Sequence, residues 1–128
     1  MIRKDYILNQ IEMLARVTAT LIFRDRDGEE GILIFNSASE GIEGDLWERL
    51  SALIQAGKIG VAEDLLYDAW DGKEGFPDLS LLNTALRFYG GLLALSPEVL
   101  KEGNFSTEEI RDGWSGIQEM AGIVDILF

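Results

Sequence analysis

The sequence predicts an all-α protein with tetratricopeptide-like stacked antiparallel helix pairs, about five to six helices, in a single domain over residues 1–128. One observation is the spacing of apolar residues, which recur every three or four positions through most of the chain, as on one face of a helix. A second is a pattern that fits the latter half of a tetratricopeptide repeat, where small residues let two helices approach closely. Its members are Gly57, Ala62, Leu66 and Ala69.

Residues 4–23 are predicted to form a long amphipathic N-terminal helix. Its apolar positions alternate by four and three residues, at Ile7, Ile11, Leu14, Thr18 and Leu21. Such a seam packs either within the domain or against a second copy of the chain. A competing interpretation makes Thr18–Arg24 and Gly31–Asn36 a β-hairpin around Asp27-Gly28, because Thr, Ile and Phe are enriched there. We favour one continuous helix, because the helical spacing is unbroken.

Residues 24–44 are expected to be a variable connector. They begin with a charged, turn-like stretch and end in a loop-like segment. Between the two lies the apolar run Ile32–Phe35. This run has to cover another apolar surface or be covered by one.

Residues 45–71 are predicted to form a helix-turn-helix. Asp45 is a candidate N-cap, because its carboxylate can accept hydrogen bonds from the free amides of the first helical turn. Gly57 stands where a helix commonly ends in a left-handed residue. Each of the two helices carries an apolar stripe, so we expect them to pack against each other in antiparallel orientation.

The segment 77–95 is the predicted central helix, because its apolar residues form two faces that neighbours can contact from both sides. Gly90-Gly91 within it indicate a close helix crossing or a kink. A short helix is expected next, with Ser96 as its N-cap and Pro97 in its first position, ending at Gly103.

The C-terminal helix is expected over residues 106–124. Ser106 and Glu109 have the spacing of a capping box, in which the serine accepts from the Glu109 amide and the glutamate side chain returns a hydrogen bond. Gly113 and Gly116 allow a neighbour to approach closely. The last residues, GIVDILF, are strongly apolar for a chain end and are expected to dock on this domain or on a partner.

Composition excludes several kinds of chemistry. The chain has no Cys and no His, which excludes disulfides, thiolate nucleophiles, Ser-His pairs and ordinary zinc sites. No glycine pattern fits a phosphate loop, and the acidic loop around Gly28 fails the register of an EF-hand. We therefore expect no cofactor, no metal site and no catalytic residue. Trp47, Trp70 and Trp114 are interpreted as core residues, with a ligand groove as the alternative.

Charge and hydropathy restrict the partners and the compartment. The formal net charge is −12 at pH 7, which repels phosphate backbones and disfavours nucleic-acid binding. The first residues lack the apolar core of a secretory signal, and no run approaches the roughly 18 apolar residues of a membrane span. We expect a cytoplasmic protein that does not contact membranes.

Three blocks of the sequence resemble a family of small, uncharacterised bacterial proteins found mainly in Gram-positive species. They are MIRKDYILNQIEMLAR, AGKIGVAEDLLYDA and ALRFYGGLLALSPEVLKEGNFSTEEIRDGW. The resemblance implies an all-helical, tetratricopeptide-like fold. It implies no activity, since the family is of unknown function and offers no functional residues to carry over. The chain departs from the family pattern at Gly60, Gly90-Gly91, Ile32–Phe35 and the apolar tail, and these departures concern partner surfaces more than the fold.

Two classes of function remain. We expect a protein–protein interaction or scaffold module without catalysis, which self-associates or holds a peptide between helix pairs. The alternative is a small-molecule or cation-binding helical protein, extending to weak catalysis by carboxylates alone. The partner is an unidentified protein, and the expected state is a homodimer. The candidate self-association surface comprises Ile7, Ile11, Leu14, Leu21, Ile126, Leu127 and Phe128.

Overall fold

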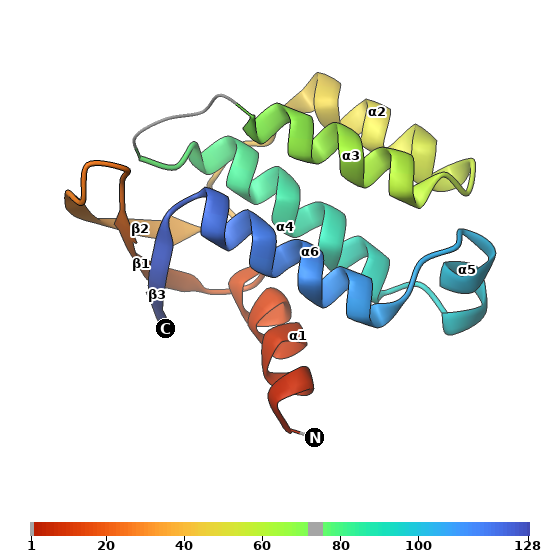
Figure 1. The fold of residues 1–128 in the computed structure, drawn as a ribbon, viewed down its shortest axis with the longest axis horizontal. Coiled ribbons are helices and arrows are strands. Elements are labelled where there is room, and N and C mark those ends of the chain that lie inside the picture. Colours follow the sequence, from red (N-terminus) through yellow and green to blue (C-terminus); the bar gives the residue numbers. More distant parts are fainter. Residues whose placement is uncertain (1, 72–75) are drawn as a thin grey trace.

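The computed structural model describes residues 2–71 and 76–128. Within these ranges the chain forms six helices and a three-stranded antiparallel sheet, so the predicted all-α, tetratricopeptide-like class is wrong and the fold is mixed α/β. The elements in chain order are α1 (Ile2–Leu14), β1 (Thr18–Arg24), β2 (Glu30–Asn36), α2 (Gly44–Gln55), α3 (Ile59–Trp70), α4 (Leu79–Leu93), α5 (Pro97–Glu102), α6 (Thr107–Met120) and β3 (Ile123–Leu127). Figure 1 shows the sheet at one end of a body of helices.

The predicted helix over residues 4–23 is wrong beyond Leu14, and the hairpin interpretation of the same stretch is right. β1 and β2 pair along their whole length, from Thr18 opposite Asn36 to Arg24 opposite Glu30. Burial alternates along β1, which is the period of a strand with one covered face. Residues 24–44 are therefore not a plain connector, because they contain β2.

The turn of the hairpin is built from the acidic loop. Gly28 takes a left-handed conformation with φ of 82°, which suits the turn position of an Asp-Gly pair. The Asp25 side chain accepts hydrogen bonds from the backbone amides of Asp27 and Glu29, at 3.0 and 2.9 Å. The carboxylate thus stabilises a turn in the chain, as Asx side chains commonly do.

The C-terminal helix is shorter than predicted and the apolar tail is a strand. α6 ends at Met120, after which Gly122 adopts φ of 74° and its carbonyl accepts a hydrogen bond from the Arg24 amide at 2.8 Å. β3 then pairs antiparallel with β1, which places β1 in the middle of the sheet. The predicted docking of the tail therefore occurs within the chain itself.

The helical hairpin predicted over residues 45–71 is confirmed as α2 and α3. Gly57 is left-handed, and the Lys58 amide reaches the Leu53 carbonyl at 2.8 Å, so that the turn is a Schellman motif. The proposed cap is wrong, because α2 begins at Gly44 and Glu43 is its N-cap, without a side-chain bond. Asp45 lies in the first turn, where its charge still suits the helix N-terminus.

Helix α4 occupies the centre, as predicted, and α1, α2, α3 and α6 all pack on it. In Figure 1 it lies between α3 and α6. Asp78 caps it by accepting from the Ser80 and Leu81 amides. The predicted Ser96 cap of α5 and the Ser106 cap of α6 are also present, with acceptor bonds from Val99 and Glu109.

Candidate functional site

The seven candidate self-association residues are divided between the core and the surface. Ile11, Leu14 and Leu21 are buried inside the chain, so they are not available to a partner. Ile7 and Ile126 are partly buried against the same core. Leu127 and Phe128 are half-exposed. The two that remain accessible lie at the end of β3, next to residues that the sequence argument did not include.

Those additional residues form the outer face of the sheet. Ile32 and Ile34 on β2 are 69% and 68% exposed. The strand register sets Ile34, Thr20 and Leu127 in one row across the three strands. The opposite face carries buried residues such as Leu21 and Phe35 and packs on the helices. We call the outward row and its neighbours the outer sheet face; its members are Thr20, Ile22, Ile32, Ile34, Asp125 and Leu127.

Charge on the outer sheet face is nearly balanced. Arg24 and Glu30 stand opposite each other at the hairpin end and form an ion pair. Asp125 lies opposite Ile22 in the second row. The apolar part of the face therefore adjoins Glu30, which is paired with Arg24, and Asp125. The whole molecule carries a net charge of −12. From sequence, the apolar run Ile32–Phe35 was expected to be covered by another surface or to cover one. The alternative hairpin interpretation paired it with β1, but the strand β3 was not predicted.

A polar cluster lies between α3, α4 and α6. The Tyr89 hydroxyl donates to Glu63 Oε2 at 2.8 Å, and the Tyr67 hydroxyl donates to the Gly113 carbonyl at 2.7 Å. A side chain at Gly113 would collide with both Glu63 and Tyr89, and one at Gly116 would collide with Tyr67. The two glycines predicted to permit close approach therefore do so.

Burial changes the acid–base behaviour of this cluster. It raises the pKa of the Glu63 carboxyl above its usual value, and the neighbouring charges of Glu109 and Asp64 raise it further, whereas the Tyr89 hydrogen bond opposes the shift. Burial also raises the pKa of the Tyr89 and Tyr67 hydroxyls. The buried Tyr89 on α4 is the hydrogen-bond partner of Glu63 on α3.

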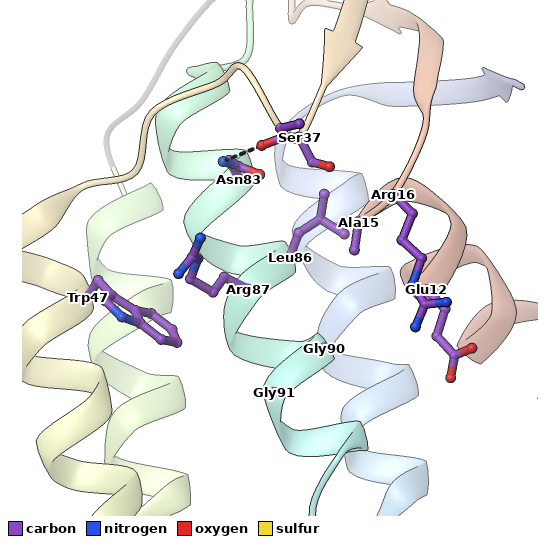
Figure 2. Close-up of a pocket in the computed structure, with 11 residues that line it drawn as sticks. Glu12, Ala15, Arg16, Ser37, Trp47, Asn83, Leu86, Arg87, Gly90 and Gly91 are labelled. Atoms are coloured by element: carbon purple, nitrogen blue, oxygen red, sulfur yellow. Dashed lines mark hydrogen bonds between the residues drawn. The ribbon is translucent and has the colours of Figure 1, made fainter.

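A groove of about 500 Å³ runs along α4 between α1 and α2. Its floor is one side of α4, and the turn after β2 closes one end. Figure 2 shows Arg16 and Glu12 on one side and Trp47 with Arg87 on the other. The full lining is Glu12, Ala15, Arg16, Ser37, Ala38, Trp47, Asn83, Leu86, Arg87, Gly90 and Gly91.

The comparison with protein families gives one match. A family model described as a family of unknown function, DUF6483, matches residues 1–122. The chain belongs to the DUF6483 family. No curated protein and no solved structure matches the DUF6483 chain. The resemblance to an uncharacterised family is thus confirmed, whereas the all-helical fold expected of it is wrong for this chain, which contains a three-stranded sheet. The bacterial, Gram-positive origin stays a prediction. The match ends at Gly122, one residue before β3.

The tryptophans of the DUF6483 chain divide between the two interpretations. Trp70 and Trp114 are buried in the core as predicted. Trp47 is partly buried and lines the groove, which was the alternative interpretation. The difference follows from position, since Trp47 lies on the groove side of α2, whereas Trp70 on α3 and Trp114 on α6 face the core.

Two further features of the DUF6483 chain concern metals and membranes. Across residues 2–71 and 76–128 no group of three or more acidic side chains is placed to hold a metal ion. No helix in the same part of the chain combines the length and the apolar character needed to cross a bilayer.

Proposed function

We propose that this protein is a non-catalytic interaction module that self-associates through the outer sheet face. The observation that carries the proposal is that Ile32 and Ile34, each about two-thirds exposed, lie on the same face of the sheet as the tail residue Leu127, with Thr20 and Ile22 of β1 between the two outer strands. Residues on one face of neighbouring strands lie close enough to act as one surface. A continuous apolar patch on a sheet is a common protein-binding surface.

A second copy of the chain is the occupant that we propose. Beside the neutral Arg24–Glu30 ion pair, the outer sheet face carries the single charge of Asp125, whereas the whole molecule carries −12, so two copies that meet here bring only one like charge each into direct contact. A further contribution comes from the open edges of β2 and β3, which each pair on one side only. Open strand edges are ready templates for association.

The expected association is weak. Burying the exposed part of each isoleucine contributes about 1–2 kcal/mol. The patch is small, and association loses translational and rotational freedom, so a dissociation constant on the order of 10–100 μM is expected. This strength suits a reversible interaction module more than an obligate dimer.

The Glu63 cluster supports the non-catalytic part of the proposal. Glu63 is a carboxylate with a raised pKa, which is the kind of group that the catalytic alternative requires. However, Tyr89 donates directly to it, and a methyl group at Gly113 would collide with the Glu63 carboxylate and the Tyr89 hydroxyl. The carboxylate is therefore engaged in the packing between the helices, which favours a structural role. The cytoplasmic location and the exclusion of nucleic-acid partners stay predictions from the sequence.

Sedimentation velocity over a range of protein concentrations tests the proposal. The wild type is expected to shift from monomer towards dimer, and the double variant Ile32→Thr, Ile34→Thr is expected to stay monomeric. Threonine keeps the β-branched shape that strands favour, and both positions face solvent in the monomer, so folding is retained. Val61→Thr is the matched control, because Val61 is an exposed apolar residue on α3.

Two results would contradict the proposal. One is a wild type that stays monomeric at several times the expected dissociation constant. The other is a double variant that dimerises as strongly as the wild type, which would place the interface elsewhere. Circular dichroism of each variant verifies that the fold is intact.

A further inference from the structure

We propose that the groove along α4 binds a small organic oxyanion, a carboxylate or phosphate ester with an apolar body, held between Arg16 and Arg87. This role is separate from self-association, because the groove lies between α1, α2 and α4 and the outer sheet face contributes no residue to it. A volume of about 500 Å³ is within the range of ligand pockets for small molecules.

Charge is the first observation. The chain carries 23 acidic and 11 basic residues, yet the groove lining holds two arginines and one glutamate, Glu12. The groove is therefore locally positive in a molecule that is strongly negative overall. Because the negative charge on the rest of the surface repels an anion, a locally positive groove is the favoured place for an anion to bind.

The state of the two arginines is the second observation. Within the part of the chain that the structure describes, no ion pair engages Arg16 or Arg87. The Arg87 guanidinium carbon lies 5.6 Å from the centre of the Trp47 ring. Figure 2 shows the Arg87 side chain extending from α4 towards Trp47. This contact limits the freedom of the guanidinium and leaves its hydrogen-bond donors available to a carboxylate or phosphate.

The end wall supplies a fixed polar group. The Asn83 amide donates to the carbonyls of Ser37, Glu40 and Gly41, at 3.4, 3.1 and 3.2 Å, and so fastens the turn after β2 to α4, as Figure 2 shows for Ser37. The Ser37 hydroxyl is buried and has no hydrogen-bond partner among the described residues. Buried polar groups normally have a partner, and an oxyanion in the groove would provide one after a small shift of the turn that exposes this hydroxyl.

The floor accommodates the apolar body of the ligand. Leu86 is buried in α4, with Gly90 and Gly91 about one turn further along the same side. A Cβ built at Gly91 meets no atom within 4 Å. The space above the helix backbone is therefore open, and a flat apolar group can lie directly on it.

An NMR titration with two probes tests the proposal. Phenyl phosphate and benzoate carry the same ring with different oxyanions, and benzyl alcohol is the uncharged control. At least one anionic probe is expected to bind with a dissociation constant of about 1 mM or tighter. It is expected to shift the Trp47 indole signal and the Gly90 and Gly91 amide signals, and to bind more tightly than benzyl alcohol. The stronger probe identifies the oxyanion class.

Variants separate a built site from general charge attraction. Arg16→Gln and Arg87→Gln are each expected to weaken the stronger probe about tenfold, whereas Arg49→Gln is not, because Arg49 is an exposed arginine on α2 outside the groove. Gly91→Leu is expected to fold, since its side chain enters open space, and to abolish binding by filling the groove.

The proposal is overturned if neither anionic probe binds when its concentration is about ten times the expected dissociation constant. It is also overturned if binding survives Gly91→Leu, or if Arg49→Gln weakens it as much as Arg16→Gln and Arg87→Gln do. Thermal unfolding of each variant shows that a loss of binding is not a loss of fold.

Discussion

At the scale of single residues, Glu63 is held in two opposing environments. Burial and the nearby carboxylates disfavour its charge, and the Tyr89 hydroxyl favours it. The net result is a raised pKa. A carboxyl whose pKa is raised on folding gives the folded state an advantage below the unfolded-state pKa, and this advantage is lost as pH rises through the folded-state pKa.

Replacing Glu63 by glutamine removes this titration and keeps an oxygen that can accept from Tyr89. The Tm difference, Glu63→Gln minus wild type, is therefore expected to grow in the positive direction between about pH 4 and about pH 7. Differential scanning calorimetry across that range measures it. Glu48→Gln, at an exposed position on α2, is the control for the change in net charge. A difference that stays constant or decreases with pH would contradict this account of the cluster.

Residue burial was largely predictable from sequence, but its cause was not always so. Leu21 was predicted to lie on the apolar face of a helix. It is buried, but it lies on a strand and not on the predicted helix. Its position ten residues after Ile11 and seven after Leu14 fits a helix by coincidence. The environment of Glu63 could not be predicted, because helical spacing considers one element alone and Tyr89 reaches Glu63 from another helix.

At the scale of elements, Gly122 joins a helix to the sheet. Its left-handed conformation ends α6, and its carbonyl accepts from the Arg24 amide of β1. A Cβ at this position would collide with the Arg24 carbonyl, which is backbone and cannot move aside. The same residue therefore sets the end of the helix, the start of β3 and the approach of β3 to β1.

Gly122→Ala is expected to lower the free energy of unfolding by about 2 kcal/mol or more, from left-handed strain together with the collision. Gly28→Ala is the matched control. Gly28 has a similar φ of 82° but nothing lies within 4 Å of its Cβ, so only the strain of about 1–2 kcal/mol applies. Urea unfolding measures both. Equal losses would show that the contact with Arg24 contributes nothing.

The elements that the sequence predicted well carry their own local signals. The Gly57 turn, the Ser96 and Ser106 caps and the central position of α4 each depend on neighbours in the chain. In the sheet, only the β1–β2 hairpin has such a signal, at Asp27-Gly28. β3 pairs with β1 across about a hundred residues, and no local pattern encodes such a pairing. The outer sheet face and the groove, which both combine distant segments, could not be found for the same reason.

At the scale of the whole molecule, net charge opposes the proposed dimer. Each copy carries −12, and the outer sheet face holds Asp125 in the row of Ile22 and Ile32. Two copies meeting through this face bring their negative fields together and place two Asp125 side chains in the interface. The Debye screening length falls from roughly 10 Å at 0.1 M salt to roughly 3 Å at 1 M, so added salt weakens the repulsion between the copies.

We therefore expect self-association to tighten several-fold when sodium chloride is raised from about 0.05 M to about 0.5 M. Asp125→Asn is expected to tighten the dimer at low salt and to reduce its salt dependence, because it removes two like charges from the interface. Asparagine keeps the oxygen that accepts from the Ile126 amide at 2.9 Å, so the strand is retained. Glu48→Gln removes the same charge from α2, outside the outer sheet face, and is expected to change the dimer less. Sedimentation equilibrium measures the dissociation constants of the dimer.

An equal effect of the two substitutions would show that Asp125 lies outside the interface. Dissociation of the dimer on adding salt would show that charges attract the copies instead of repelling them.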